Sequence, residues 1–226
     1  MISPIPSAYQ SLVLDASVTI NLLASGMAES VLKALSCTVY IEPTTRAEVS
    51  KLTGFPSAVS DLLAALEAKG LLIQRKLIDA EIGVFFDLAG ADAPDDLDDG
   101  EAAAIALAQA ISAAVEIDER KGRRIFRGRY ADLHLTSSLE IFCDERVVEG
   151  LSWDNVTDAI KKALLVGRMR VFDEYDEEVR ELIGHEFAGR CPSLKKRKRS
   201  PSVEEVVACG THPPSPHRPP APSGCR

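Results

Sequence analysis

The chain has 226 residues, of which 46% are hydrophobic, and a formal net charge of −8, so it can form one ordinary domain, alone or with a tail. It has no apolar run of the roughly 20 residues that cross a bilayer, and its start, "MISPIPSAYQ", lacks the features of a signal peptide. Its five scattered cysteines form no CxxC pair, which argues against a zinc site or a disulfide framework. We therefore expect a cytoplasmic protein without membrane association.

Short apolar runs alternate with helical periodicity along most of the chain. These runs predict strands within 11–17, 37–43, 73–79, 112–118 and 131–138. Helical spacing predicts helices within 17–26, 28–36, 44–52, 56–72, 100–111, 119–129, 139–150 and 153–167. Ser17 is a candidate N-cap of the first helix, and Thr44 or Thr45 is expected near the cap of the third. A flexible acidic stretch is expected at 90–99, "GADAPDDLDD".

Strands that are separated by helices pair in parallel. The sequence therefore predicts an α/β fold with three layers, in which helices flank a central parallel sheet. In such sheets, ligands bind at the carboxyl ends of the strands. Asp15 and Asp118 both lie where an expected strand ends.

Charge and proline content change near residue 190. Residues 1–190 carry 19 Lys and Arg against 32 Asp and Glu, whereas residues 191–226 carry 7 against 2 and hold 8 of the 13 prolines. With little apolar content, this second segment cannot compensate the entropy lost on ordering. We predict a disordered, basic and proline-rich tail from about 190 to 226, with a few residues of boundary error. Its "KKRKR" run at 195–199 could contact nucleic acid, resembles a nuclear localisation signal, or has no function.

Four acids stand at expected element ends or first turns: Asp15, Glu48, Glu101 and Asp118. Each has an ordinary explanation taken alone, such as a helix cap, a favourable position in a first helical turn, or an exposed helix surface. Brought together at one sheet edge, however, they would repel each other unless a cation lay among them. Hard divalent cations prefer oxygen ligands, and such ions support phosphodiester hydrolysis. The four acids are therefore candidates for both metal binding and catalysis.

Four segments carry a family resemblance: "LVLDASVTINLL", "IEPTTRAEVSKL", "LDDGEAAAIALA" and "AAVEIDERKGRRIFRG". In this order and spacing they resemble the PIN domain family, and more narrowly its bacterial and archaeal toxin-type members, described as predicted nucleic-acid-binding proteins. The resemblance covers roughly residues 11–150. It leaves an N-terminal extension at 1–10, a helical extension at 151–189 that we expect to pack on the domain, and the tail at 190–226.

The resemblance implies a PIN fold and a ribonuclease site that depends on Mg²⁺ or Mn²⁺. Its four acids fall on Asp15, Glu48, Glu101 and Asp118, and Glu42 competes with Glu48 for the second. Supporting positions fall on Ser17, Glu119, Thr136 and Ser137. Many members carry two aspartates where this chain has Asp118 and Glu119, so the contribution of Glu119 stays open.

A basic run follows Asp118 directly. It is formed by Arg120, Lys121, Arg123, Arg124, Arg127 and Arg129. Such cations could hold RNA phosphates beside the cleavage site, and a solvated helix face is an equally good interpretation. His134, inside an expected strand, is a poor candidate for a general base.

The resemblance further implies an RNA substrate, a cognate antitoxin protein and a homodimer or higher assembly. We expect the toxin ribonuclease of a toxin–antitoxin pair; the alternative is a PIN-fold module that binds RNA or a protein without catalysis. Two other classes fit less well. Phosphatases with an aspartyl nucleophile carry a second aspartate where this chain has Ser17, and dinucleotide-binding domains need a glycine-rich turn that "DASVTIN" lacks.

Overall fold

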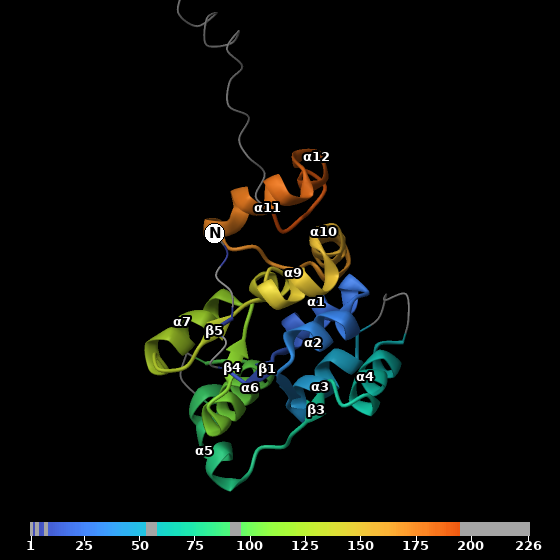
Figure 1. Ribbon diagram of the computed structural model, residues 1–226. Helices are drawn as coiled ribbons and strands as arrows, with labels where there is room; N and C mark the ends of the chain where they lie inside the picture. The colour runs from blue at the N-terminus through green and yellow to red at the C-terminus, as the bar shows by residue number, and fades with distance from the viewer. Residues whose placement is uncertain (1, 3–4, 7–8, 53–57, 91–95, 195–226) are drawn as a thin grey trace, which may run out of the picture. The chain divides into compact units, whose positions relative to one another are not determined.

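A five-stranded parallel sheet organises the protein in the computed structural model, which describes residues 2, 5–6, 9–52, 58–90 and 96–194. The strand order is β3-β2-β1-β4-β5, and each neighbouring pair is parallel (Figure 1). The strands are β1 (Ser11–Leu14), β2 (Thr38–Ile41), β3 (Ile73–Gln74), β4 (Ala114–Glu116) and β5 (Leu135–Thr136). The predicted α/β class with a parallel sheet is confirmed. The strand expected at 73–79 is short, because only Ile73 and Gln74 pair, at the exposed sheet edge.

Two apolar cores cover the two faces of the sheet. In β1, Leu12 and Leu14 enter one core and Val13 enters the other, as expected when successive side chains of a strand point to opposite faces. Helices on the first face are α1 (Ala16–Ser25), α2 (Ala28–Leu35), α3 (Pro43–Ser50), α4 (Val59–Ala68), α8 (Ser138–Phe142), α9 (Glu145–Leu151) and α10 (Trp153–Lys162). Helices α11 (Asp176–Ile183) and α12 (His185–Ala188) extend the same core beyond α10, away from the sheet. The second face is covered by α5 (Asp79–Ala89), α6 (Asp99–Ile111) and α7 (Arg120–Arg129). Helices therefore flank the sheet on both sides.

Two helix starts differ from the predicted caps. Asp15, not Ser17, is the N-cap of α1, and Glu42 caps α3, which begins at Pro43. Proline suits this first helical position because its missing N–H would have no helical partner there. In both cases an acid at the end of a strand directly starts the next helix.

Helix α5 was not among the expected elements. It buries only Glu81 and Leu88 and leaves Phe86 63% exposed, so its apolar residues do not form the stripe that marks a helix in a sequence. Its start is stabilised by Glu81, which accepts a hydrogen bond from the Ile78 amide and pairs with Arg75. The predicted flexible stretch at 90–99 overlaps this region, and residues 91–95 of it lie outside the described part.

Both ends of the described chain pack against the rest. The Ile5 amide donates to Asp144, and Ile5 is buried. The helical extension shares the first core through Val156, Ile160 and other buried residues, in one compact unit up to residue 194. Cys191 and Leu194 are also buried, so packed structure continues four residues past the expected start of the tail. The rest of the predicted tail, 195–226, lies outside the described residues.

Within the described part, none of the helices alone has the length and apolar composition needed to cross a bilayer.

Phe142 is fully buried in the first core, so its truncation leaves a cavity. We expect Phe142→Ala to lower the free energy of unfolding by about 3–5 kcal/mol, measured by urea titration. Phe86→Ala, at an exposed site on α5, is the matched control and should cost less than about 1 kcal/mol. Equal losses in both variants would contradict the assigned core.

Candidate functional site

Four buried carboxyl groups gather at the carboxyl edge of the central strands. Asp15 follows β1, Glu116 ends β4, Asp118 lies two residues further, and Glu101 is in the first turn of α6. We call these four residues the acidic cluster. Each is at most 6% exposed, and the negative charges of its members raise one another's pKa values, as for Asp15 by Asp118 and for Glu101 by Asp15.

Asp15 serves as a helix cap and as a member of this cluster. Its Oδ1 accepts hydrogen bonds from the Val18 amide at 3.0 Å and from the Ser17 hydroxyl at 2.8 Å. Ser17 therefore orients the carboxylate of Asp15. Burial raises the pKa of Asp15 to about 7, and the charge of Asp118 adds to this rise.

Asp118 is held by three donors. The Ser138 amide and hydroxyl donate to it at 3.0 and 2.6 Å, and Asn21 Nδ2 donates at 2.8 Å. Burial raises the pKa of Asp118, although these hydrogen bonds oppose the rise. Neither Asn21 nor Ser138 was predicted from the sequence. A polar residue inside the apolar helix segment "VTINLL" is the only signal that pointed to Asn21.

Glu101 lies directly against α7. A Cβ atom placed on Gly122 would be 2.6 Å from Glu101 Oε1, so a glycine is needed for this approach. Glu101 Oε1 is buried and has no hydrogen-bond partner among the described residues. Burial raises the pKa of Glu101 to about 8, with further contributions from the charges of Asp98 and Asp15.

Glu116 is the member that sequence reasoning missed. It is 0% exposed, and neither of its carboxyl oxygens has a hydrogen-bond partner in the described part of the chain. Burial raises its pKa well above the ordinary range, and the charges of Asp118, Glu140 and Asp15 add to the rise. An acid within the apolar run "AAVEID" was the available signal.

Glu48 lies at the margin of the cluster. It is exposed on α3, and a Cβ atom on Gly100, at the start of α6, would lie 2.8 Å from Glu48 Oε2 and 3.5 Å from Asp98 Oδ1. Partial burial and the charge of Asp98 raise its pKa. Its competitor Glu42 is engaged as the cap of α3, where it accepts from the Thr44 amide. Glu48 is thus the acid that approaches α6.

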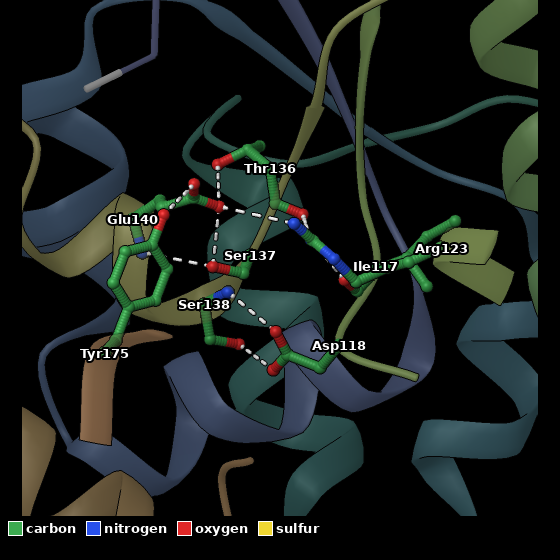
Figure 2. A network of polar contacts seen from close by, with 8 residues as sticks. All are labelled: Ile117, Asp118, Arg123, Thr136, Ser137, Ser138, Glu140 and Tyr175. Carbon is green, nitrogen blue, oxygen red and sulfur yellow. Dashed lines mark hydrogen bonds and ion pairs between the residues drawn. The ribbon is translucent and has the colours of Figure 1, made fainter. Parts of the chain in front are cut away.

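A buried network supports the ends of β4 and β5 (Figure 2). Arg123 donates to the carbonyl oxygens of Ile117 and Thr136 at 2.9 and 2.7 Å and lies 3.9 Å from Glu140. The hydroxyl of Tyr175 donates to Glu140 Oε1 at 3.1 Å. Burial together with Glu140 raises the pKa of Tyr175 to about 12.

Three predicted roles are corrected by this network. Arg123 is 4% exposed and engaged with backbone carbonyls, so it does not fit the predicted surface contact to RNA. The hydroxyls of Thr136 and Ser137 contact Glu140 Oε2 at 3.4 and 2.7 Å, not the acidic cluster. The hydroxyl that contacts Asp118 is that of the next residue, Ser138, because the strand ends at Thr136 and the chain turns into α8.

The remaining residues of the basic run lie on the surface. Arg120 pairs with Asp173 at 2.9 Å, and Lys121 pairs with Asp96 at 2.8 Å. The residues Arg124, Arg127 and Arg129 are exposed on α7. Glu119 pairs with Arg170 at 2.7 Å and adds to the rise in the pKa of Glu101, so it acts beside the cluster. His134 is half-buried and its ring lies against that of Tyr9, with 5.3 Å between the centroids.

Two other buried acids among the described residues have close arginine partners. Asp144, 1% exposed, pairs with Arg146 at 2.8 Å, and Glu81 pairs with Arg75 at 2.6 Å. In contrast, the acidic cluster leaves oxygens of Glu101 and Glu116 without hydrogen-bond partners within the described residues. Buried charge without compensation is costly, so these carboxyls hold protons or take up a cation.

The donor chemistry fits a hard divalent cation, since the available ligands are carboxylate oxygens. Across the described ranges, however, no three His, Cys, Asp or Glu side chains form a ready-made metal-binding group. The cluster therefore offers suitable oxygens but not a preformed coordination shell.

Comparison with known proteins finds no matching family model, no matching curated protein and no matching solved structure.

The raised pKa values make stability depend on pH. In the unfolded chain these carboxyls ionise near pH 4, whereas the folded pKa values of Asp15 and Glu101 are about 7 and about 8. Between these limits the folded state keeps protons that the unfolded state has released, so stability falls from about pH 4 up to the folded pKa values and levels off above about pH 8. In EDTA, we expect urea titrations to show a loss of several kcal/mol, on the order of 5 kcal/mol, between about pH 5 and about pH 8.5.

Glu101→Gln should make this loss smaller, because it removes one of the titrating groups. Glu149→Gln, at an exposed position on α9, should leave the pH profile unchanged. A flat wild-type profile would contradict the raised pKa values.

Gly122→Ala should displace the carboxylate of Glu101. The added Cβ would also meet Ile117 Cγ2 at 3.0 Å, so we expect a loss of about 1–3 kcal/mol in the free energy of unfolding. Gly128→Ala on the same helix meets no atom within 4 Å and should stabilise by about 0.5–1 kcal/mol. Urea titration of both variants measures the difference, and equal effects would show that Glu101 does not occupy the space beside Gly122.

Proposed function

We propose that this chain is a ribonuclease that depends on Mg²⁺ or Mn²⁺ and has a PIN-like fold. The observation that carries the proposal is the acidic cluster at the carboxyl edge of the parallel sheet, where buried oxygens of Glu101 and Glu116 have no hydrogen-bond partner among the described residues. Ligand sites of open parallel sheets lie at this edge. The sequence segments that resemble the PIN family contain all four cluster members and Glu48.

Asp15, Glu101 and Asp118 would hold one or two ions, with Glu48 as a further ligand or orienting group. A divalent ion supplies positive charge that offsets the negative charge developing on a phosphodiester during hydrolysis. Ser17 orients Asp15, while Ser138 and Asn21 orient Asp118. Because these contacts are made by buried groups of fixed elements, they keep the two carboxylates in place.

The protonation state of the acidic cluster is part of this proposal. Glu101, with a pKa of about 8, holds a proton at neutral pH in the absence of a cation. Binding of a cation therefore releases protons and becomes stronger as the pH rises. Glu116 lies fully buried beside Asp118, and its raised pKa favours the protonated form, which limits the charge of the cluster.

The partners follow from the proposed class. RNA is the proposed substrate, and exposed Arg120, Arg124, Arg127 and Lys121 are the proposed phosphate contacts. The resemblance to toxin-type PIN proteins supports a cognate antitoxin and a homodimer. A short open reading frame beside the coding sequence would favour the antitoxin.

Cleavage of a panel of structured RNAs tests the proposal. We expect wild-type protein to cleave with Mg²⁺ or Mn²⁺ and not in EDTA. Asp15→Asn and Asp118→Asn should each reduce the rate by more than about 100-fold, beyond the loss typical of outer-shell metal partners. Asp158→Asn, an exposed acid on α10, is the matched control and should keep full activity.

Thermal denaturation provides a second readout that does not depend on finding the right RNA. Mg²⁺ should raise the melting temperature of the wild type at pH 8 and not that of the two site variants. Cleavage that persists in EDTA or in both folded variants would contradict the proposed site. RNA binding without cleavage across the panel would instead favour the non-catalytic alternative.

A further inference from the structure

A groove lined by arginines runs along one side of α7. It consists of two adjoining depressions of about 370 and 330 Å³, which share Arg120 and Phe172. We call it the arginine groove. Its exposed cationic lining is formed by Arg120, Arg124, Arg127, Arg168 and Arg170, and the buried Arg123 lies in its floor. Two of these, Arg168 and Arg170, come from the segment after α10 and lie outside the region that resembles the PIN family.

The charge of the groove is opposite to that of the surrounding protein. Residues 1–190 have 13 more acidic than basic residues, whereas the groove brings six arginines together. The acids around it include Glu119, Asp173 and Glu174. Positive charge thus exceeds negative charge among these groups, which favours an anionic ligand.

The ion pairs at the rim are weak enough to be exchanged. Arg120 pairs with Asp173, and the two side chains are 61% and 55% exposed. Arg170 pairs with Glu119, with 53% and 40% exposure. Exposed pairs of this kind contribute about 0–1 kcal/mol. A phosphate, which guanidinium groups bind in two-pronged fashion, can replace either carboxylate.

The floor of the groove is formed by a buried, hydrogen-bonded arginine and is connected to the acidic cluster. The guanidinium of Arg123 lies over the Phe172 ring, 4.4 Å from its centroid, and bonds to the carbonyl of Ile117, next to Asp118. At the rim, Glu119 pairs with Arg170 and also acts electrostatically on Glu101. The groove therefore borders the acidic cluster along α7 and the segment that precedes it.

We propose that the arginine groove binds the phosphodiester backbone of RNA next to the acidic cluster. This inference rests on the proposed ribonuclease function and deepens it, because it assigns part of the substrate contact to the C-terminal extension. The backbone of a single strand offers one phosphate per nucleotide, so several arginines can bind at once. The phosphate contacts position the strand and carry no sequence information.

Fluorescence anisotropy with a labelled single-stranded RNA tests the groove. The full chain is titrated in EDTA at several salt concentrations, so that binding is measured without cleavage. We compare wild type with the double variant Arg120→Gln/Arg170→Gln, which changes one exposed arginine of α7 and one of the segment after α10. The control is Lys162→Gln/Lys76→Gln, which removes the same charge from exposed positions that do not line the groove.

We expect the groove variant to bind roughly tenfold more weakly, because each of its two substitutions removes an arginine that pairs with an RNA phosphate. The slope of log K against log salt should fall by about 0.7 for each arginine–phosphate pair that is removed on a single strand. The control should stay within about twofold of wild type. The groove inference is overturned if wild type does not bind RNA, or if the groove variant binds as the control does.

The two experiments can refute the ribonuclease proposal and the groove proposal independently of each other. RNA binding through the groove without metal-dependent cleavage would contradict the ribonuclease proposal alone. Cleavage by a protein whose groove variant binds RNA normally would contradict the groove alone.

Discussion

Burial of carboxyl groups at the carboxyl edge of the sheet is the constraint on which the rest of this structure depends. Parallel strands end at the same edge, so Asp15 after β1 and Asp118 after β4 come together as soon as β1 and β4 pair. A carboxylate that leaves water without a partner loses several kcal/mol of solvation. Some neighbours supply donors to these groups, as Ser138 does for Asp118, whereas the oxygens of Glu116 have no hydrogen-bond partner among the described residues and burial raises its pKa.

Arg123 is a buried cation that helps the fold to tolerate this concentration of acids. Its guanidinium is surrounded by the carbonyl ends of two strands, by the ring of Phe172 and, at a longer distance, by Glu140. A buried arginine normally requires partners on most of its donors, and this one finds them on three different parts of the chain. Arg123 also lies in the floor of the arginine groove. The strand ends beside the acidic cluster and the groove are therefore stabilised by the same side chain.

The sequence predicted the architecture better than it predicted contacts. Alternating strands and helices were sufficient for a parallel sheet, and three of the four singled-out acids are buried together. Glu116 was missed because β4 is buried on both faces, and periodicity cannot then distinguish an inward acid from an outward one. Ser137 and Ser138 are neighbours, and which hydroxyl reaches Asp118 depends on where β5 ends. The burial of Arg123 depends on Phe172, far along the chain, which no local pattern of charges in α7 could indicate.

The contact between Tyr175 and Glu140 has a consequence for synthesis of the protein. Asp15 leaves the ribosome first, whereas Ser138, which orients Asp118, and Tyr175, which completes the network behind it, follow more than a hundred residues later. Domains fold as units during translation, when the residues that they need are available. A nascent chain thus carries its acids long before they are assembled, and the support of the cluster is complete only when about three quarters of the 226 residues have been made. Incomplete chains released early would carry the acids without the structure that orients them.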